Sequence, residues 1–519
     1  MKYAIAFAAA LLCSSLSAQD YRLNELPEPG AYVRDFRVAS DGRHVVYLAR
    51  PRGVAVLQLY LVDAQRPRER RLLDGRNCIE IELAGDRLVY SRYDGVAFHI
   101  SSLLLDGRSS PVELALGNGA RPTPDGRTVV FRNAQGLFSV PADGSAPPRL
   151  VQASTPAPVH AQWVLSPDSR RVVYVTEGIN AGRGLVHSAL LDSSAAPVAL
   201  NTSAIPCGVG NHVISPDSRW VVFRRVDIMR GVGLYRVPID GSAPAVRLHD
   251  PLPVGAEVEI FHTYTTPLFT PDSQRVLYRL EQEAPDLTEL YSAPLDGSSA
   301  PVKLSDEADR YVLMFRISPD GSRVVFTRSA ASLADPFDLF WVPSAGGAPP
   351  VQLNAPLVPG GSVRVFTIGP DSRTVAYAAQ QERLDRLDLL SVSMDGGAPP
   401  RVLSLPDQDC FPPHPDGLEF ARQGEFVVYP NAPLDGAGNS YELFCADVQG
   451  LGTPRRLSGP MVTGGSLISL DPFFLSLQNR AVRFAANGTL ALFRADQEKN
   501  DVFELWAAPI PDGPSLRRP

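Results

Sequence analysis

The stretch Ser318-Pro319-Asp320-Gly321 is followed by Arg323-Val324-Val325-Phe326, and this pair of motifs decides the fold. In Ser-Pro-Asp-Gly, proline fixes φ at the second turn position, while serine and glycine suit the first and fourth positions. The Val-Val-Phe run is β-branched and aromatic, as expected of a strand buried on both faces. The pair therefore predicts a tight turn that leads into a central β-strand.

This pair of motifs recurs along the whole chain. Ten copies are recognisable, at intervals of roughly 40 to 63 residues, the range expected of propeller blades. The other copies lie at residues 123–126, 166–169, 215–218, 270–273 and 369–372, with a variant lacking proline at 40–42 and weaker copies at 85–86, 423–424 and 487–488. The repeats follow one another without a linker, so they predict one continuous repeat domain.

Each repeat carries two further strand-like runs. Glu289-Leu290-Tyr291 predicts a third strand, and it ends in the turn Pro294-Leu295-Asp296-Gly297. Pro301-Val302-Lys303-Leu304 predicts a short outer strand, because proline fits an edge position. Four strands per repeat with no helical period between them define a blade. We therefore predict an all-β fold, a propeller of about ten four-stranded blades.

The N-terminal segment Tyr21-Arg22-Leu23-Asn24 matches the outer-strand pattern of internal repeats such as Val351-Gln352-Leu353-Asn354. The last repeat runs through Glu504-Leu505-Trp506 and has little chain left for its own outer strand. We therefore expect residues 21–26 to supply the outer strand of the last blade and to close one ring, which removes an open edge. Two smaller rings are the alternative.

These repeats resemble the WD40-like propeller repeats of TolB-type proteins, which also occur in the propeller domains of dipeptidyl-peptidase-like and tricorn-like proteases. The resemblance covers about residues 21–512 and implies the fold rather than a function, since one fold hosts many roles. We expect no counterpart of the small α/β domain that precedes the TolB propeller, so TolB partner contacts are not transferred. We also expect no counterpart of the hydrolase domain of the peptidases.

The first eighteen residues are typical of an export signal. Lys2 gives a positive start, residues 5–12 are apolar but too short to span a bilayer, and Ser17-Ala18 suits cleavage before Gln19. Leu12 stands before Cys13 where a lipoprotein needs a small residue, so no lipid anchor is expected. We predict a signal peptide at 1–18, a propeller domain at 19–519, and a periplasmic or extracellular location.

Composition limits the classes of partner. The net charge of −7 argues against a broad nucleic-acid footprint. No later stretch approaches 18 apolar residues, so we expect no membrane span. Arg66, Arg68, Arg70 and Arg71 form the one dense basic cluster, interpreted as a solvated loop and strand edge. The partner is an unknown protein or glycan, and a monomer is expected.

Export permits disulfides among the four cysteines that follow the signal segment. Cys410 and Cys445 fall within one repeat, so they are the expected pair if any pair forms. Cys78 and Cys207 lie three repeats apart, and sequence does not decide their pairing. None of the four shows the spacing of a metal site.

Catalytic motifs are not found. No G-x-S-x-G, P-loop, G-x-G-x-x-G, H-E-x-x-H or EF-hand pattern occurs. The repeated aspartates are interpreted as turn residues that bond to their own backbone. These aspartates are Asp125, Asp168, Asp217, Asp272, Asp320 and Asp371. We predict no catalytic, cofactor-binding or metal-binding residue.

Histidine is the one ambiguous feature. Four histidines precede the turn motif of their repeats, in segments that return toward the central axis: His160, His212, His262 and His414. Some propeller lyases that act on oligosaccharides hold a metal with axial histidines. Here the spacings differ and the blades are not all neighbours, so exposed or hydrogen-bonded loop histidines are the expectation.

Three functional hypotheses remain. The first is a non-catalytic binding or scaffold protein that presents propeller loops to a ligand. The alternative is a carbohydrate-active enzyme, a polysaccharide lyase or glycosidase, with its site in the axial funnel. Paired carboxylates or clustered histidines in the funnel would favour the enzyme. A surface-layer or adhesion module is the third hypothesis.

Overall fold

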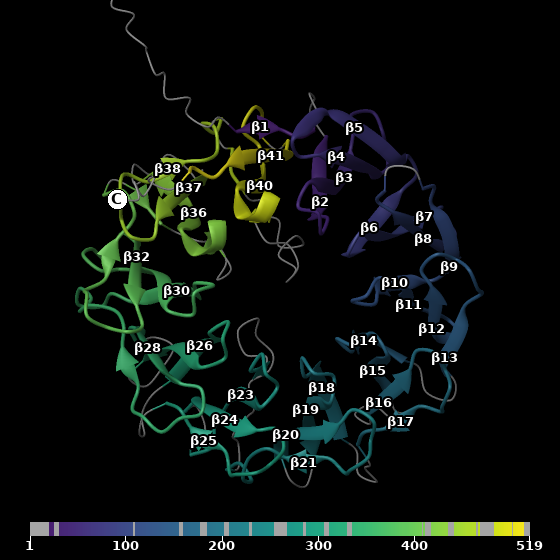
Figure 1. The fold of residues 1–519 in the computed structure, drawn as a ribbon, viewed down its shortest axis with the longest axis horizontal. Coiled ribbons are helices and arrows are strands. Elements are labelled where there is room, and N and C mark those ends of the chain that lie inside the picture. The colour runs from purple at the N-terminus through teal and green to yellow at the C-terminus, as the bar shows by residue number, and fades with distance from the viewer. Residues whose placement is uncertain are drawn as a thin grey trace, which may run out of the picture.

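A computed structural model gives the arrangement of the chain. It describes residues 20–24, 31–106, 109–154, 159–176, 184–201, 207–227, 231–253, 267–283, 287–305, 311–329, 335–406, 408–410, 417–433, 441–462, 465–467, 482–500 and 502–512. Ten antiparallel sheets stand side by side in one ring (Figure 1), so the predicted ten-bladed β-propeller is confirmed and two smaller rings are not formed. Blades are numbered along the chain, and the last sheet is blade 10.

Each of the first five blades has four strands that pair in chain order. Blade 1 contains β2 (Tyr32–Val38), β3 (His44–Arg50), β4 (Gln58–Asp63) and β5 (Arg66–Asp74). Blade 2 contains β6 (Cys78–Ala84), β7 (Arg87–Tyr93), β8 (Phe98–Leu104) and β9 (Val112–Leu116). Blade 3 contains β10 (Asn118–Pro122), β11 (Thr128–Asn133), β12 (Gly136–Pro141) and β13 (Arg149–Ala153). Blade 4 contains β14 (Val159–Leu165), β15 (Arg171–Thr176), β16 (Leu185–Leu190) and β17 (Val198–Ala199). Blade 5 contains β18 (Cys207–Ile214), β19 (Trp220–Asp227), β20 (Gly231–Pro238) and β21 (Val246–Arg247).

The remaining blades keep this order, with two inner segments in blade 9. Blade 6 contains β22 (Leu268–Phe269), β23 (Arg275–Leu280), β24 (Glu289–Pro294) and β25 (Val302–Lys303). Blade 7 contains β26 (Tyr311–Ile317), β27 (Arg323–Ser329), β28 (Asp338–Pro343) and β29 (Val351–Gln352). Blade 8 contains β30 (Val363–Ile368), β31 (Thr374–Ala379), β32 (Asp388–Ser393) and β33 (Arg401–Val402). Blade 9 contains β34 (Gln408–Asp409), β35 (Glu419–Ala421), β36 (Phe426–Pro433), β37 (Glu442–Asp447) and β38 (Arg455–Arg456). Blade 10 contains β39 (Val482–Ala485), β40 (Leu490–Ala495) and β41 (Glu504–Pro509), with β1 (Tyr21–Arg22) at its outer edge.

The N-terminal segment closes the ring, as predicted. Tyr21 pairs with Ala507 in β41, next to the C-terminal blade in Figure 1. Leu23 donates its backbone N–H to the Leu505 carbonyl at 2.8 Å and is buried between blades 10 and 1. The Asn24 side chain accepts the N–H of Leu505 at 2.5 Å. Residues 25 and 26 of the expected strand lie outside the described residues.

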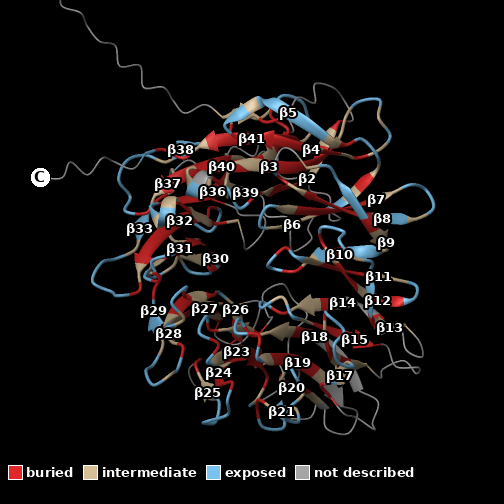
Figure 2. Cartoon of the chain, turned by 45° about the vertical axis from the view of Figure 1, so that its right-hand side comes forward, coloured by how far each residue is buried: buried red, intermediate tan, exposed pale blue. Residues whose placement is uncertain are grey.

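The core consists of ten apolar layers, one at each interface between neighbouring blades. Figure 2 shows the buried residues concentrated on the strands, with exposed residues at the turns and outer edges. Val324 packs toward blade 6 and Val325 toward blade 8, because successive side chains on a strand point to opposite faces. Both valines are 0% exposed, which confirms the predicted central strand.

The turns after the innermost strands are hydrogen-bonded from blade to blade. Ser218 has φ of 63°, a left-handed conformation that costs a residue other than glycine free energy. Its Oγ accepts the backbone N–H of Asp168 in the preceding blade at 2.9 Å. The same contact joins three further pairs: Ser169 with Asp125, Ser273 with Asp217, and Ser372 with Asp320. We infer that serine is tolerated at this position because its hydroxyl connects neighbouring blades.

Blades 9 and 10 carry two of the three weak copies of the turn motif, and their turns differ. In place of Ser-Pro-Asp-Gly they form short 3-10 turns, η1 (Arg422–Gly424) and η3 (Ala486–Gly488). Gln423 and Asn487 take positive φ there. Within the described part of the chain no helix is long and apolar enough to cross a membrane.

The expected disulfide is not present. Cys78, Cys410 and Cys445 are buried free thiols, so the pairing of Cys410 with Cys445 was wrong. Cys445 lies in the layer between blades 9 and 10, whereas Cys410 lies in the layer between blades 8 and 9. The two thiols therefore lie on opposite sides of the blade 9 sheet. Two residues of one repeat can point to different faces of their sheet, because side chains alternate along a strand. The side chain of Cys207 lies outside what the structure describes.

Candidate functional site

The innermost strand of every blade carries one equivalent position, two residues before the turn begins. At this position each residue pairs with the middle residue of the second strand, as Arg37 pairs with Val46 and Val164 pairs with Val173. We call this set the inner rim. From blade 1 to blade 10 it consists of Arg37, Glu82, Arg121, Val164, Val213, Leu268, Arg316, Thr367, Glu419 and Arg483.

The inner rim divides into two arcs. Blades 7 to 10 and 1 to 3 contribute four arginines, two glutamates and a threonine, whereas blades 4 to 6 contribute Val164, Val213 and Leu268. Most of these residues are half-buried, and Arg121 is exposed. The polar arc therefore spans seven neighbouring blades of the ring and the apolar arc the other three, in the blade order that Figure 1 shows.

The charged arc is held in place by contacts between blades. Arg37 lies 2.5 Å from Asp35 and 4.0 Å from Glu82 of the next blade. Arg121 stacks over the ring of Trp163 at 5.0 Å, and Arg483 lies 5.7 Å from the ring centre of Phe36. Such cation–π contacts fix a guanidinium group while its edge stays available. The charges of this arc are thus preorganised.

Glu82 is the most perturbed carboxyl group of the inner rim. Burial raises the pKa of Glu82 above its usual range, and the nearby carboxylates of Asp35 and Glu80 act in the same direction. The positive charges of Arg37 and Arg121 oppose this shift. A carboxyl group in these surroundings holds its proton to a higher pH than a solvated one, so it is the best acid–base candidate on the rim.

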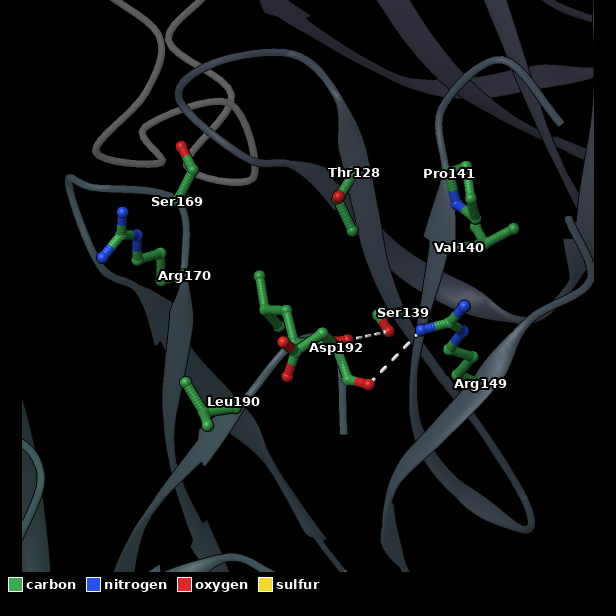
Figure 3. Close-up of a pocket in the computed structure, with 10 residues that line it drawn as sticks. Thr128, Ser139, Val140, Pro141, Arg149, Ser169, Arg170, Leu190 and Asp192 are labelled. Atoms are coloured by element: carbon green, nitrogen blue, oxygen red, sulfur yellow. Dashed lines mark hydrogen bonds between the residues drawn. The ribbon is translucent and has the colours of Figure 1, made fainter. Parts of the chain in front are cut away.

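A second candidate is a cleft of about 510 Å³ between blades 3 and 4. In Figure 3, Arg149 and Ser139 lie on one wall, and Asp192 and Arg170 lie on the other. Ser139 donates to the Leu191 carbonyl at 2.6 Å and Arg149 donates to the Asp192 carbonyl at 3.4 Å. A similar cleft of about 520 Å³ lies between blades 2 and 3. These clefts are a product of the repeat, and their polar groups mainly join the blades.

The predicted turn role of the repeated aspartates is confirmed. Asp168 accepts the Ser166 hydroxyl at 2.5 Å and the Arg170 backbone N–H at 3.1 Å. Equivalent hydroxyl contacts of 2.6 Å occur at Asp125, Asp217 and Asp320. Asp371 accepts from Thr374 instead, and Asp272 accepts the N–H of Gln274.

The histidines do not form a described cluster. His212 is on the innermost strand β18, but it occupies the buried position next to the rim and lies between blades 4 and 5. Its Nε2 is 3.1 Å from the Val173 carbonyl. The side chain of His160 and all of His262 and His414 lie outside the described residues. Among the residues that are described, no group of three histidine, cysteine or acidic side chains is placed to hold a metal ion.

The sequence analysis missed the inner rim. Its residues fall in the variable part of each repeat, and no motif surrounds them. A signal was nevertheless present, because the rim residue stands at a fixed distance before every turn motif. Comparing that one position across ten repeats separates the charged from the apolar blades.

These features define the chain as a ten-bladed β-propeller. No family model and no curated protein matches it. Similar solved structures include a putative TolB from Agrobacterium tumefaciens, with 17% identity over 47% of this chain and 83% of that chain and a TM-score of 0.29. An oligogalacturonate lyase from Vibrio parahaemolyticus has 13% identity over 70% and 97%, with a TM-score of 0.36. Dipeptidyl peptidase 4 from Porphyromonas gingivalis has 14% identity over 73% and 56%, with a TM-score of 0.45.

Proposed function

We propose that this protein is a non-catalytic binding or scaffold protein that holds a protein or glycan ligand at the inner rim. The observation that carries the proposal is the division of one repeated position into a charged arc and an apolar arc. All ten residues pair in the same register with a buried partner, although Val213 and Leu268 also pack against neighbouring core layers. A ligand with a polar and an apolar side would account for the division, and both glycans and peptides have such sides.

The proposal includes export and a monomeric state. Residues 1–18 act as the signal segment, and the propeller at 19–519 works in the periplasm or outside the cell. Mass spectrometry of the protein recovered from the periplasm or medium should give Gln19 as the first residue. Light scattering should give the mass of one chain. Retention of Met1 in a cytoplasmic fraction would overturn the location.

Ligand binding is tested with a glycan array for sugars and with a photo-crosslinking residue at Thr367 for proteins. Hits are measured by calorimetry on wild type, Arg121→Ala and Arg127→Ala. Arg127 is an exposed arginine on the turn of the same blade, so it is the matched control. We expect Arg121→Ala to weaken binding by about tenfold, about 1.4 kcal/mol, and Arg127→Ala to leave it unchanged. Equal effects of the two variants would contradict a rim site.

A carbohydrate-active enzyme, a polysaccharide lyase or glycosidase, is the second candidate because burial raises the pKa of Glu82 near Asp35. A carboxyl group with a raised pKa near a second carboxylate is an arrangement that glycosidases use. Array hits should therefore be incubated with wild type, Glu82→Gln and Glu80→Gln, and the products should be analysed by mass spectrometry. We expect no cleavage. Cleavage abolished in Glu82→Gln and retained in Glu80→Gln would replace the scaffold proposal with the enzyme.

A further inference from the structure

The outer strand of blade 1 differs from the other outer strands. β5 has nine residues, whereas β9 and β13 have five and the outer strands of the other seven blades have two. Short outer strands protect a propeller from pairing with other chains, because they offer few free backbone groups. β5 is too long to be protected in this way. Figure 2 shows it as a largely exposed strand.

β5 is the last strand of its sheet, since the pairing order of blade 1 is β2-β3-β4-β5. Its inner edge pairs with β4, from Leu59 opposite Asp74 to Asp63 opposite Arg66. In the described structure no strand pairs with its outer edge. Pro67 has no N–H and the pairing with β4 shifts register twice, so an added strand can pair with only part of this edge. Strand addition is a common way to bind an extended peptide.

The side chains of β5 specify the charge of such a peptide. Arg66, Arg68, Arg70 and Arg71 are exposed, and Glu69 is the one exposed acidic residue of the strand, since Asp74 at its end is buried. The chain as a whole has a net charge of −7, so this strand carries the opposite sign to the protein that bears it. Leu72, which is 51% exposed, adds an apolar contact at the end of the strand.

We propose that β5 binds an extended acidic segment of a partner protein, which adds as a fifth strand to blade 1. Backbone pairing along the outer edge supplies affinity, and the arginines select carboxylate side chains. A nucleic acid has no backbone that could pair with a strand edge, so the edge geometry favours a peptide. The site lies on the outer edge of blade 1 and does not depend on the inner-rim proposal.

The test uses a fluorescent peptide of about nine residues with alternating glutamate and valine, a length matched to strand addition along β5. A second peptide carries proline in place of valine and cannot pair as a strand. A single-stranded oligonucleotide of similar charge is the third probe. Binding is measured by anisotropy for wild type, Arg68→Glu/Arg70→Glu and Arg455→Glu/Arg456→Glu. The last variant is the matched control, since β38 is also an exposed basic outer strand but has only two residues.

We expect the glutamate–valine peptide to bind wild type and the β38 variant equally, and the β5 variant at least about tenfold more weakly. Hydrogen exchange of residues 66–74 should slow on binding. Equal affinity for the proline peptide would refute strand addition, and tighter binding of the oligonucleotide would refute the peptide partner. Absence of binding by any probe, or an equal loss in the β38 variant, would overturn the proposal.

Discussion

His249 makes blade 5 sensitive to acid. It is 8% exposed, its Nε2 accepts the backbone N–H of Leu234 at 3.0 Å, and its Nδ1 lies 2.6 Å from the Asp250 carbonyl. A ring that accepts at Nε2 must be neutral, with the proton on Nδ1. Burial lowers the pKa of His249 from 6.5 to about 4. Blades 4, 7 and 10 place asparagine at the same position: Asn201, Asn354 and Asn24.

The sign and size of the effect follow from this pKa. The unfolded blade binds a proton as the pH falls through 6.5, whereas the folded blade does not until the pH reaches about 4. Stability from the neutral ring is therefore complete above pH 6.5 and declines between pH 6.5 and pH 4. Between pH 7 and pH 4.5 the loss amounts to about 2 kcal/mol. His249→Asn keeps an acceptor for Leu234 and removes this dependence.

Native-state hydrogen exchange of the Leu234 amide measures the effect, after correction for the intrinsic rate at each pH. In wild type, protection of this amide should fall about sixtyfold between pH 7 and pH 4.5, whereas His249→Asn should lose much less. The Leu339 amide, which donates to Asn354 in blade 7, is the internal control. A parallel loss at Leu234 in wild type and His249→Asn would refute the assignment of the acid sensitivity to His249.

Three other changes test the packing of the ring. Val325→Asp places a charge in an apolar layer and should destabilise blade 7 by several kcal/mol, whereas Val351→Asp on the exposed outer strand of the same blade should leave the melting temperature nearly unchanged. Ser218→Ala keeps the positive φ and loses the hydrogen bond to Asp168, so it should lower the free energy of unfolding in urea by about 1 kcal/mol. Ser218→Gly should stay closer to wild type, because glycine adopts a positive φ without strain. An equal loss of stability in both variants would contradict the role of the backbone conformation. Deletion of residues 19–27 opens the edge of β41 and should lower the melting temperature and promote aggregation, and an unchanged melting curve would argue against closure by the N-terminus.

The fold could be predicted from the sequence because short segments of each repeat determine its turns and strands. The Ser-Pro-Asp-Gly turn and the Val-Val-Phe strand depend on neighbouring residues, and the structure has both as expected around Val325. The ring closure could also be predicted, since Asn24 belongs to a pattern that the internal outer strands repeat. These features rest on backbone conformation and period-2 burial, which a short segment specifies.

The repeat did not show toward which neighbouring blade a given side chain points. Cys410 and Cys445 share a repeat but face different layers, so proximity along the chain did not bring their thiols together. His212 was expected to be an exposed or hydrogen-bonded loop histidine; it is hydrogen-bonded, but it lies buried on a strand, because a shift of one residue turns a rim side chain into a core side chain. Register against the second strand decides both cases.

The same register argument explains why the inner rim is informative. Each rim residue lies opposite a buried residue of the second strand, as Leu268 does opposite Leu277 and Arg316 opposite Val325, so the backbone environment is nearly constant around the ring. Because this backbone environment is nearly the same in every blade, a difference in rim side chains between blades needs a cause other than the repeat itself. Contacts between blades account for part of it, since Arg37 faces Glu82 of the next blade. They also account for part of the apolar arc, since Val213 packs against the layer between blades 5 and 6 and Leu268 packs against the layer between blades 6 and 7. Val164 is half-buried and belongs to neither of the layers beside blade 4, so among these three residues it is the one that the proposed ligand is expected to contact.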